Sequence, residues 1–137
     1  MKRIIFFLSM SVLFTSTALL MTDCKKSTTT PPITPAFIVT STTVTLQTGG
    51  FGLQFYAKCT NTDVKLTKVT ISDPLQTGNV VYNLNSTTYV QNQIFDLQDA
   101  NTAYIKQSGN WQFTFVGNRT SDGGSFAAVA TVAVSGK

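Results

Sequence analysis

Residues 51–59 read FGLQFYAKC, and this stretch decides the fold class. Apolar and polar side chains alternate along it, which is the two-residue period of a β-strand with one buried face. The apolar face would hold Phe51, Leu53, Phe55, Ala57 and Cys59. The other face would hold Gln54, Tyr56, Lys58 and Thr60. We therefore expect a half-buried strand whose Cys59 thiol points into the core.

The same period recurs near the C-terminus. Residues 109–117 (GNWQFTFVG) place Trp111, Phe113 and Phe115 on one face, which makes Trp111 a core residue. Residues 125–134 (SFAAVATVAV) alternate in the same way. The glycine-containing segment between these two strands predicts a hairpin.

Four further segments complete the expected strands. Residues 37–46 and 87–97 each predict one or two strands, and residues 79–84 predict a short one. Residues 64–72 (VKLTKVTIS) change phase midway, and one extra residue near Thr67, a β-bulge, would restore the alternation. No helical period occurs after the N-terminal segment.

Seven or eight short strands, separated by turns, predict an all-β fold built as an antiparallel two-sheet sandwich. A small barrel or a jelly roll is the alternative. The body resembles immunoglobulin-like domains of bacterial surface proteins, and DANTAY at residues 99–104 is similar to the turn that precedes a late strand in that family. The family's paired cysteines are missing from residues 36–137, which contain Cys59 alone.

The N-terminus has the three parts of a secretory signal peptide. Lys2 and Arg3 precede an apolar run over residues 4–14, and small polar residues follow it. We expect residues 1–23 to form a helical leader that is absent from the mature fold.

Cys24 ends the stretch Leu20-Met21-Thr22-Asp23-Cys24, which resembles the lipobox of bacterial lipoproteins. Met21 replaces the usual leucine, and Asp23 departs from the small residue that the family favours before the cysteine. The resemblance implies that Cys24 is acylated and becomes the first residue of the mature chain. It also implies attachment to the bacterial cell envelope, on the periplasmic or surface face of the outer membrane.

Two other outcomes of export stay open. Cleavage after Ser16-Thr17-Ala18 would release a soluble secreted domain that begins at Leu19 and keeps Cys24 as a thiol. An uncut leader would act as a membrane anchor. A disulfide between Cys24 and Cys59 is disfavoured, because it would draw the segment before the body into the core.

Residues 24–35 predict a tether between the lipid and the body, which spans residues 36–137. Its STTTPPITP stretch, residues 27–35, holds three prolines and favours an extended backbone that reaches about 28 Å. Lys25 and Lys26 would lie at anionic headgroups, or would simply make the start of the tether soluble.

The basic balance of the chain does not indicate nucleic-acid binding. The full sequence has ten Lys and Arg against six acidic residues, but four of the ten precede residue 36. The body keeps six basic residues against five Asp, a net charge of +1. A nucleic-acid surface needs a clustered positive field, and Lys65 with Lys68 is a thin one.

The composition argues against an enzyme. The chain has no His and no Glu, which excludes His-dependent triads, the common zinc sites and glutamate pairs. Two Asp could serve as a catalytic pair, but Asp96 and Asp99 fit turn formation better. We expect no catalytic residue and no cofactor.

Two weak binding sites come from residue type alone. Hard oxygen ligands for calcium occur near glycines in two loops, at Asp96, Asp99, Asn101, Asn118 and Asp122, without the spacing of a dedicated calcium loop. Planar rings that could stack on a sugar or an apolar ligand occur at Tyr56, Tyr89 and Tyr104.

The sequence thus favours a lipid-anchored β-sandwich that presents a surface for protein interaction or adhesion. Its partners would be the membrane, through the lipid, and an envelope protein or a glycan. The alternative is a carbohydrate-binding or calcium-binding module.

Overall fold

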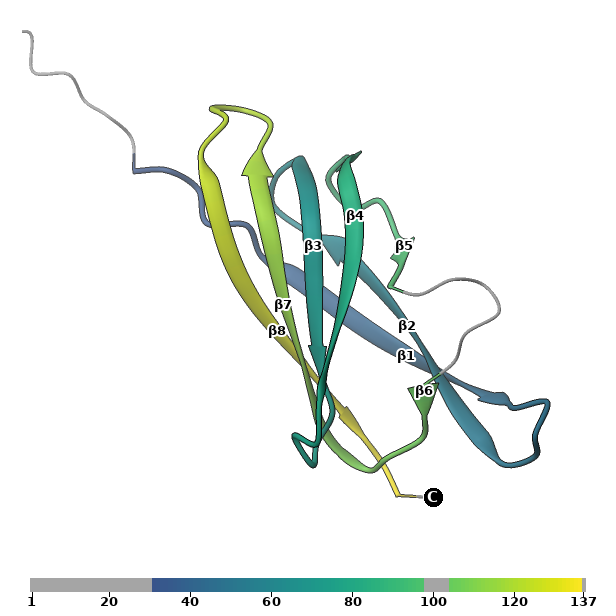
Figure 1. Ribbon diagram of the computed structural model, residues 1–137. Coiled ribbons are helices and arrows are strands. Elements are labelled where there is room, and N and C mark those ends of the chain that lie inside the picture. The colour runs from purple at the N-terminus through teal and green to yellow at the C-terminus, as the bar shows by residue number, and fades with distance from the viewer. Residues whose placement is uncertain (1–30, 98–103, 137) are drawn as a thin grey trace, which may run out of the picture. The chain divides into compact units, whose positions relative to one another are not determined.

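The computed structural model describes residues 31–97 and 104–136, and every regular element within them is a β-strand (Figure 1). The prediction of an all-β fold is confirmed for this part of the chain. The eight strands are β1 Phe37–Thr45, β2 Phe51–Cys59, β3 Val64–Ser72, β4 Asn79–Tyr89, β5 Phe95–Asp96, β6 Tyr104–Ile105, β7 Gly109–Arg119 and β8 Ser125–Val134.

The strands form two antiparallel sheets (Figure 1). In the first sheet, β1 pairs with β2, and the short strands β5 and β6 pair with two successive stretches of β2. The second sheet has the order β4-β3-β7-β8. The predicted hairpin of residues 109–117 and 125–134 is confirmed as β7 and β8, which pair along their whole length.

Aromatic rings from both sheets meet in the core. Phe55 of β2 lies 5.0 Å from Trp111 and 4.9 Å from Phe113 of β7, measured between ring centroids. Phe37 of β1 stacks on Phe115 of β7 at 4.0 Å. These side chains occupy the apolar positions of the alternating pattern in their strands. They therefore face the space between the two sheets and fill it. Trp111 and Cys59 are buried, as predicted.

The phase change in β3 is a β-bulge, as predicted. The register of β3 against β7 shifts between Leu66 and Lys68, which leaves Thr67 as the extra residue. The Thr67 hydroxyl donates to the Val116 carbonyl oxygen at 2.9 Å. Opposite the bulge lies Gly117, where a Cβ atom would collide with the Lys65 carbonyl oxygen and stand 3.0 Å from the Leu66 Cα. Only glycine fits there without displacing β3.

The sequence predicted one strand that ends at residue 84 and another that begins at residue 87, and this separation is wrong. β4 runs from Asn79 to Tyr89 as one strand, and the interruption is a kink within it. Asn85 and Ser86 have positive φ angles of 48° and 61°, and the Thr87 hydroxyl donates to the Leu84 carbonyl oxygen. The kink absorbs the residues that β3 cannot pair, so the strand continues beyond it.

One further expectation, at Phe51, needs correction, and the structure adds detail within residues 87–97. Phe51 is 64% exposed although it shares the phase of the buried residues of β2, because it is the first residue of that strand and lies at the end of the sheet. Within residues 87–97, strand pairing stops after Tyr89 and resumes only at Phe95 and Asp96. The Gln93 amide donates to the Val90 carbonyl oxygen there, which closes a turn.

The bulge yields a stability test. Gly117→Ala should lower the free energy of unfolding by about 1–3 kcal/mol, because the added methyl group forces two paired strands apart. Gly78→Ala is the matched control, since a Cβ at Gly78 meets nothing within 4 Å. That control should change stability by less than about 0.5 kcal/mol. Equal effects of the two substitutions in urea titrations would contradict the close approach at Gly117.

Candidate functional site

The sandwich has two ends that differ in what they carry. We call the end with the β2–β3 turn and the β7–β8 turn the proximal end, because residues 34–36 join the body there. We call the end with the β1–β2 turn, the β3–β4 turn and residues 106–108 the distal end. Figure 1 shows the C-terminus at this distal end.

Asn61, in the β2–β3 turn, fixes the chain at the proximal end. Its Nδ2 donates to the Thr34 carbonyl oxygen at 2.9 Å, and its Oδ1 accepts from the Ala36 amide at 2.9 Å. The Thr60 amide donates to the Ala36 carbonyl oxygen, also at 2.9 Å. These bonds set the point at which the preceding segment leaves the body.

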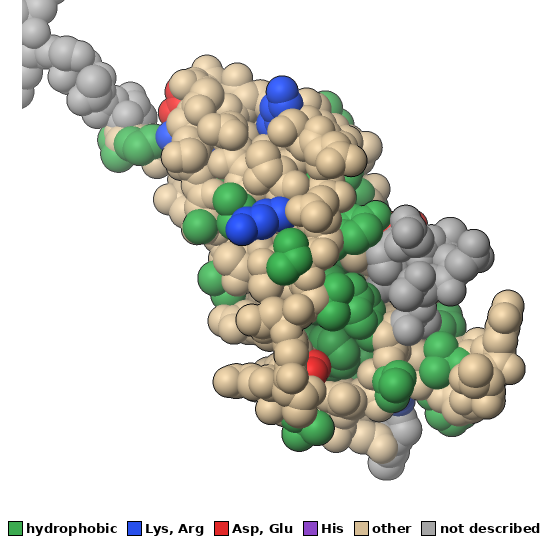
Figure 2. Space-filling view, viewed as in Figure 1, with side chains coloured by type: hydrophobic (Ala, Val, Ile, Leu, Met, Phe, Trp, Pro, Cys, Tyr) green, Lys and Arg blue, Asp and Glu red, His purple; other side chains and the backbone are tan. Residues whose placement is uncertain are grey.

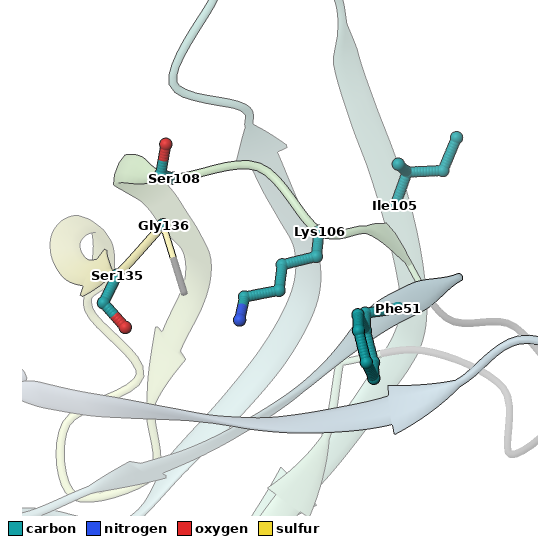
Figure 3. A pocket seen from close by; sticks show the side chains of 6 residues that line it. All are labelled: Phe51, Ile105, Lys106, Ser108, Ser135 and Gly136. Carbon is teal, nitrogen blue, oxygen red and sulfur yellow. The ribbon is translucent and has the colours of Figure 1, made fainter.

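The distal end carries two adjoining pockets. The first, which we call the basic pocket, has a volume of about 430 Å³ and is lined by Phe51, Ile105, Lys106, Ser108, Ser135 and Gly136 (Figure 3). The Lys106 side chain extends toward Ser135 and Gly136, whereas the Ser108 hydroxyl points away from it. The Lys106 amide donates to the Phe51 carbonyl oxygen at 3.1 Å, which holds β6 against the start of β2.

The second pocket, which we call the tryptophan pocket, shares Ile105 with the first and has a volume of about 160 Å³. Its lining comes from both sheets: Ile71, Asp73, Gly78, Val80, Tyr104, Ile105, Gln107 and Trp111. Figure 2 shows hydrophobic side chains gathered beside β4 toward β6, with an acidic side chain at their border.

Gln107 has an unusual place in this lining. Its backbone carbonyl oxygen accepts the Trp111 indole N–H at 3.0 Å, so the tryptophan is held by the same residue. Its side-chain Oε1 is buried and has no hydrogen-bond partner among the residues that the structure describes. A buried acceptor without a donor is destabilising, and in native proteins such an atom usually has a water or a ligand as its partner.

Asp73 supplies the negative charge of the tryptophan pocket. Its carboxylate accepts from the Thr77 hydroxyl at 2.7 Å and from the Thr77 amide at 3.2 Å. The Thr77 hydroxyl hydrogen bond is the main reason why the pKa of Asp73 lies below its usual value, and the backbone amides of Thr77, Leu75 and Gln76 add to it. The carboxylate is therefore ionised at neutral pH.

The three tyrosines singled out in the sequence do not form one exposed surface. Tyr56 is half-buried on the side of β2 that faces away from the core, and its hydroxyl donates to Gln54 Oε1 at 3.2 Å. Tyr89 does not offer an open ring to a ligand, because its ring is buried and stacks on Phe95 with the centroids 4.0 Å apart. The end of β4 bends over β5, which an alternation rule does not foresee.

Tyr104 is half-buried rather than open to solvent, and it lines the tryptophan pocket. Its ring centroid lies 5.7 Å from that of Phe55 and 5.9 Å from that of Trp111. Burial raises the pKa of the Tyr104 phenol, and the nearby Tyr82 raises it further. Burial is also the main cause that raises the pKa of Tyr89, and the charge of Tyr82 adds to it.

Two of the calcium candidates, Asn118 and Asp122, already form hydrogen bonds or an ion pair within the β7–β8 turn. Asp122 forms a two-pronged ion pair with Arg119, whose Nε lies 2.9 Å from Oδ1 and whose Nη2 lies 2.9 Å from Oδ2. This hydrogen bonding is the main cause that lowers the pKa of Asp122. Asn118 Nδ2 donates to the Gly123 carbonyl oxygen, which closes the β7–β8 turn.

The remaining candidates fall in two groups. Asp96 is exposed in β5, opposite Tyr56, whereas Asp99 and Asn101 lie outside the described residues. In residues 31–97 and 104–136 no three Cys or Asp side chains come together as metal ligands. Cys24 and the whole leader also lie outside the described residues. We find no helix that could cross a bilayer in the part of the chain that the structure covers.

No protein-family model, curated protein or solved structure matches the chain. The candidate site is therefore defined by its own geometry, which places the two pockets at the end opposite the one where residues 34–36 join the body.

The attachment of residues 34–36 to the body can be tested at Asn61. Asn61→Ala should lower the free energy of unfolding by about 1 kcal/mol and should speed hydrogen exchange at the Ala36 amide, because that amide loses its acceptor. Asn110→Ala, at an exposed site on β7, is the control and should leave both unchanged. An unaltered exchange rate at Ala36 in Asn61→Ala would show that Asn61 does not fix the tether.

Proposed function

We propose that this protein is a bacterial cell-envelope lipoprotein whose β-sandwich presents its distal end to a partner protein and catalyses no reaction. The lipid would sit on Cys24, and residues 24–35 would hold the body away from the membrane. The proposal is supported by the positions of two features at opposite ends of the sandwich. Residues 34–36 join the body beside Asn61 at the proximal end, and both pockets lie at the distal end. An anchor at the proximal end would leave the distal end facing away from the lipid.

We also propose that the sandwich is of the immunoglobulin-like type. Immunoglobulin domains place strands A, B and E in one sheet and strands C, F and G in the other, where an added C′ lies beside C. The orders β1-β2-β5 and β4-β3-β7-β8 fit that scheme, with β5 and β6 sharing the position of strand E. Loops at one end of such sandwiches commonly bind partners, which supports the binding role of the distal end.

A binding role rather than catalysis is supported by the polar groups of the pockets. In the basic pocket the Ser108 hydroxyl points away from Lys106, so Ser108 does not have this lysine beside it as a base (Figure 3). A serine nucleophile needs a base within hydrogen-bond reach. The tryptophan pocket contains one carboxylate, which Thr77 already holds. Polar side chains among exposed apolar ones, here Gln107, Asp73 and Lys106 beside Ile105, are features of recognition surfaces.

The lipid attachment is tested on protein recovered from bacterial membranes. The intact mass should correspond to a chain that begins at Cys24 with added acyl groups, and the protein should partition into detergent. Cys24→Ala should abolish both properties, whereas the control Ser27→Ala should leave them unchanged. Asp23→Gly should increase the fraction of processed chains, because a small residue there matches the lipobox.

A chain that begins at Leu19 and stays in the aqueous phase would contradict the anchor. The body would then be a secreted domain with Cys24 as an ordinary thiol.

A further inference from the structure

The size of the tryptophan pocket limits what can enter it. Its volume of about 160 Å³ corresponds to roughly five water molecules, at about 30 Å³ each. Pockets that enclose a whole small-molecule ligand start at roughly 300 Å³. The pocket therefore suits a single extended side chain of a partner protein better than a complete metabolite.

The lining of the pocket specifies the chemistry of that side chain. Ile71, Val80 and Ile105 offer apolar walls to an aliphatic stem. Two of the lining side chains, those of Asp73 and Gln107, are polar and not aromatic. Asp73 presents a carboxylate, and Gln107 presents a buried oxygen that has no hydrogen-bond partner among the described residues. Both are acceptors, so the head of the entering side chain must donate hydrogen bonds, and the carboxylate favours a positive charge.

From this lining we infer that the tryptophan pocket binds one arginine side chain of a partner protein. The inference rests on the proposed function and names the chemistry of the partner that the distal end would bind. The guanidinium would donate to Gln107 Oε1 and pair with the Asp73 carboxylate, while its stem would cover the exposed Ile105. Ile105 is 71% exposed, so a stem laid on it would remove apolar surface from water.

Arginine fits better than the other donors. Its planar head carries five N–H groups in a fixed fork, so one head can donate to Gln107 Oε1 and to the Asp73 carboxylate at once. A lysine head is a strongly hydrated point charge and would lose more hydration in a pocket with apolar walls. A sugar would need an open aromatic face, but Trp111 is only 3% exposed.

The chain contains its own reporter for this binding. Trp111 is the only tryptophan in the full sequence, so its fluorescence reports on the tryptophan pocket without labelling. The probe is N-acetyl-arginine amide, added to the full-length protein in detergent micelles. N-acetyl-citrulline amide is the matched probe, because it has the same shape without the charge. Methyl glucoside tests the sugar alternative.

We expect a saturable change of Trp111 emission with arginine, with a dissociation constant on the order of 1 mM for so small a probe. Citrulline should bind about tenfold more weakly or not at all. Gln107→Met should weaken arginine binding about tenfold, because a hydrogen bond to a charged group is lost. Gln112→Met makes the same change on the exposed side of β7 and should bind arginine like the parent protein.

Equal binding of arginine and citrulline would overturn the inference, because the charge would then have no part in recognition. No saturable change with arginine, or saturation by methyl glucoside alone, would also overturn it. The folded state of Gln107→Met is checked by thermal unfolding, where removal of an unpartnered buried oxygen should leave the melting temperature unchanged or raise it. None of these results depends on Cys24, so the lipid anchor is tested separately by its own mass measurement.

Discussion

The fold depends on the contact of Phe55 with Trp111 and Phe113, which joins the two sheets. Neither sheet could bury its apolar face alone, because each strand exposes one side and hides the other. Phe55 and Phe113 are fully buried, and the Phe37–Phe115 stack repeats the contact further along the same interface.

The same contact also builds the candidate site. Trp111 is at once a core residue and part of the tryptophan pocket, and the Gln107 carbonyl oxygen fixes its indole. Tyr104 packs on both Phe55 and Trp111, so β6 is held where Ile105 can separate the two pockets. A rigid core beneath a small pocket would keep the pocket in shape before the proposed partner binds, which would reduce the entropy lost on binding.

The two-residue period was enough to predict the long strands, the bulge at Thr67 and the buried Trp111, because each follows from local alternation. It could not foresee that the kink at Asn85 and Ser86 keeps β4 continuous, since two non-glycine residues with positive φ leave no clear trace in composition. The two-residue period could not predict the pockets either. Gln107 and Asp73 are 34 positions apart in the numbering, and they line the same pocket because β3, which Asp73 follows, pairs with β7, which Gln107 precedes.

The most direct test of this account is a nuclear Overhauser measurement from the Trp111 indole protons of the folded protein. The account predicts cross-peaks from the indole to the Phe55 ring and to the Tyr104 ring, whose centroids lie 5.0 Å and 5.9 Å away. It also predicts slow exchange of the indole N–H that donates to Gln107. An indole with cross-peaks to neither ring and a rapidly exchanging N–H would contradict both the core and the pocket built on it.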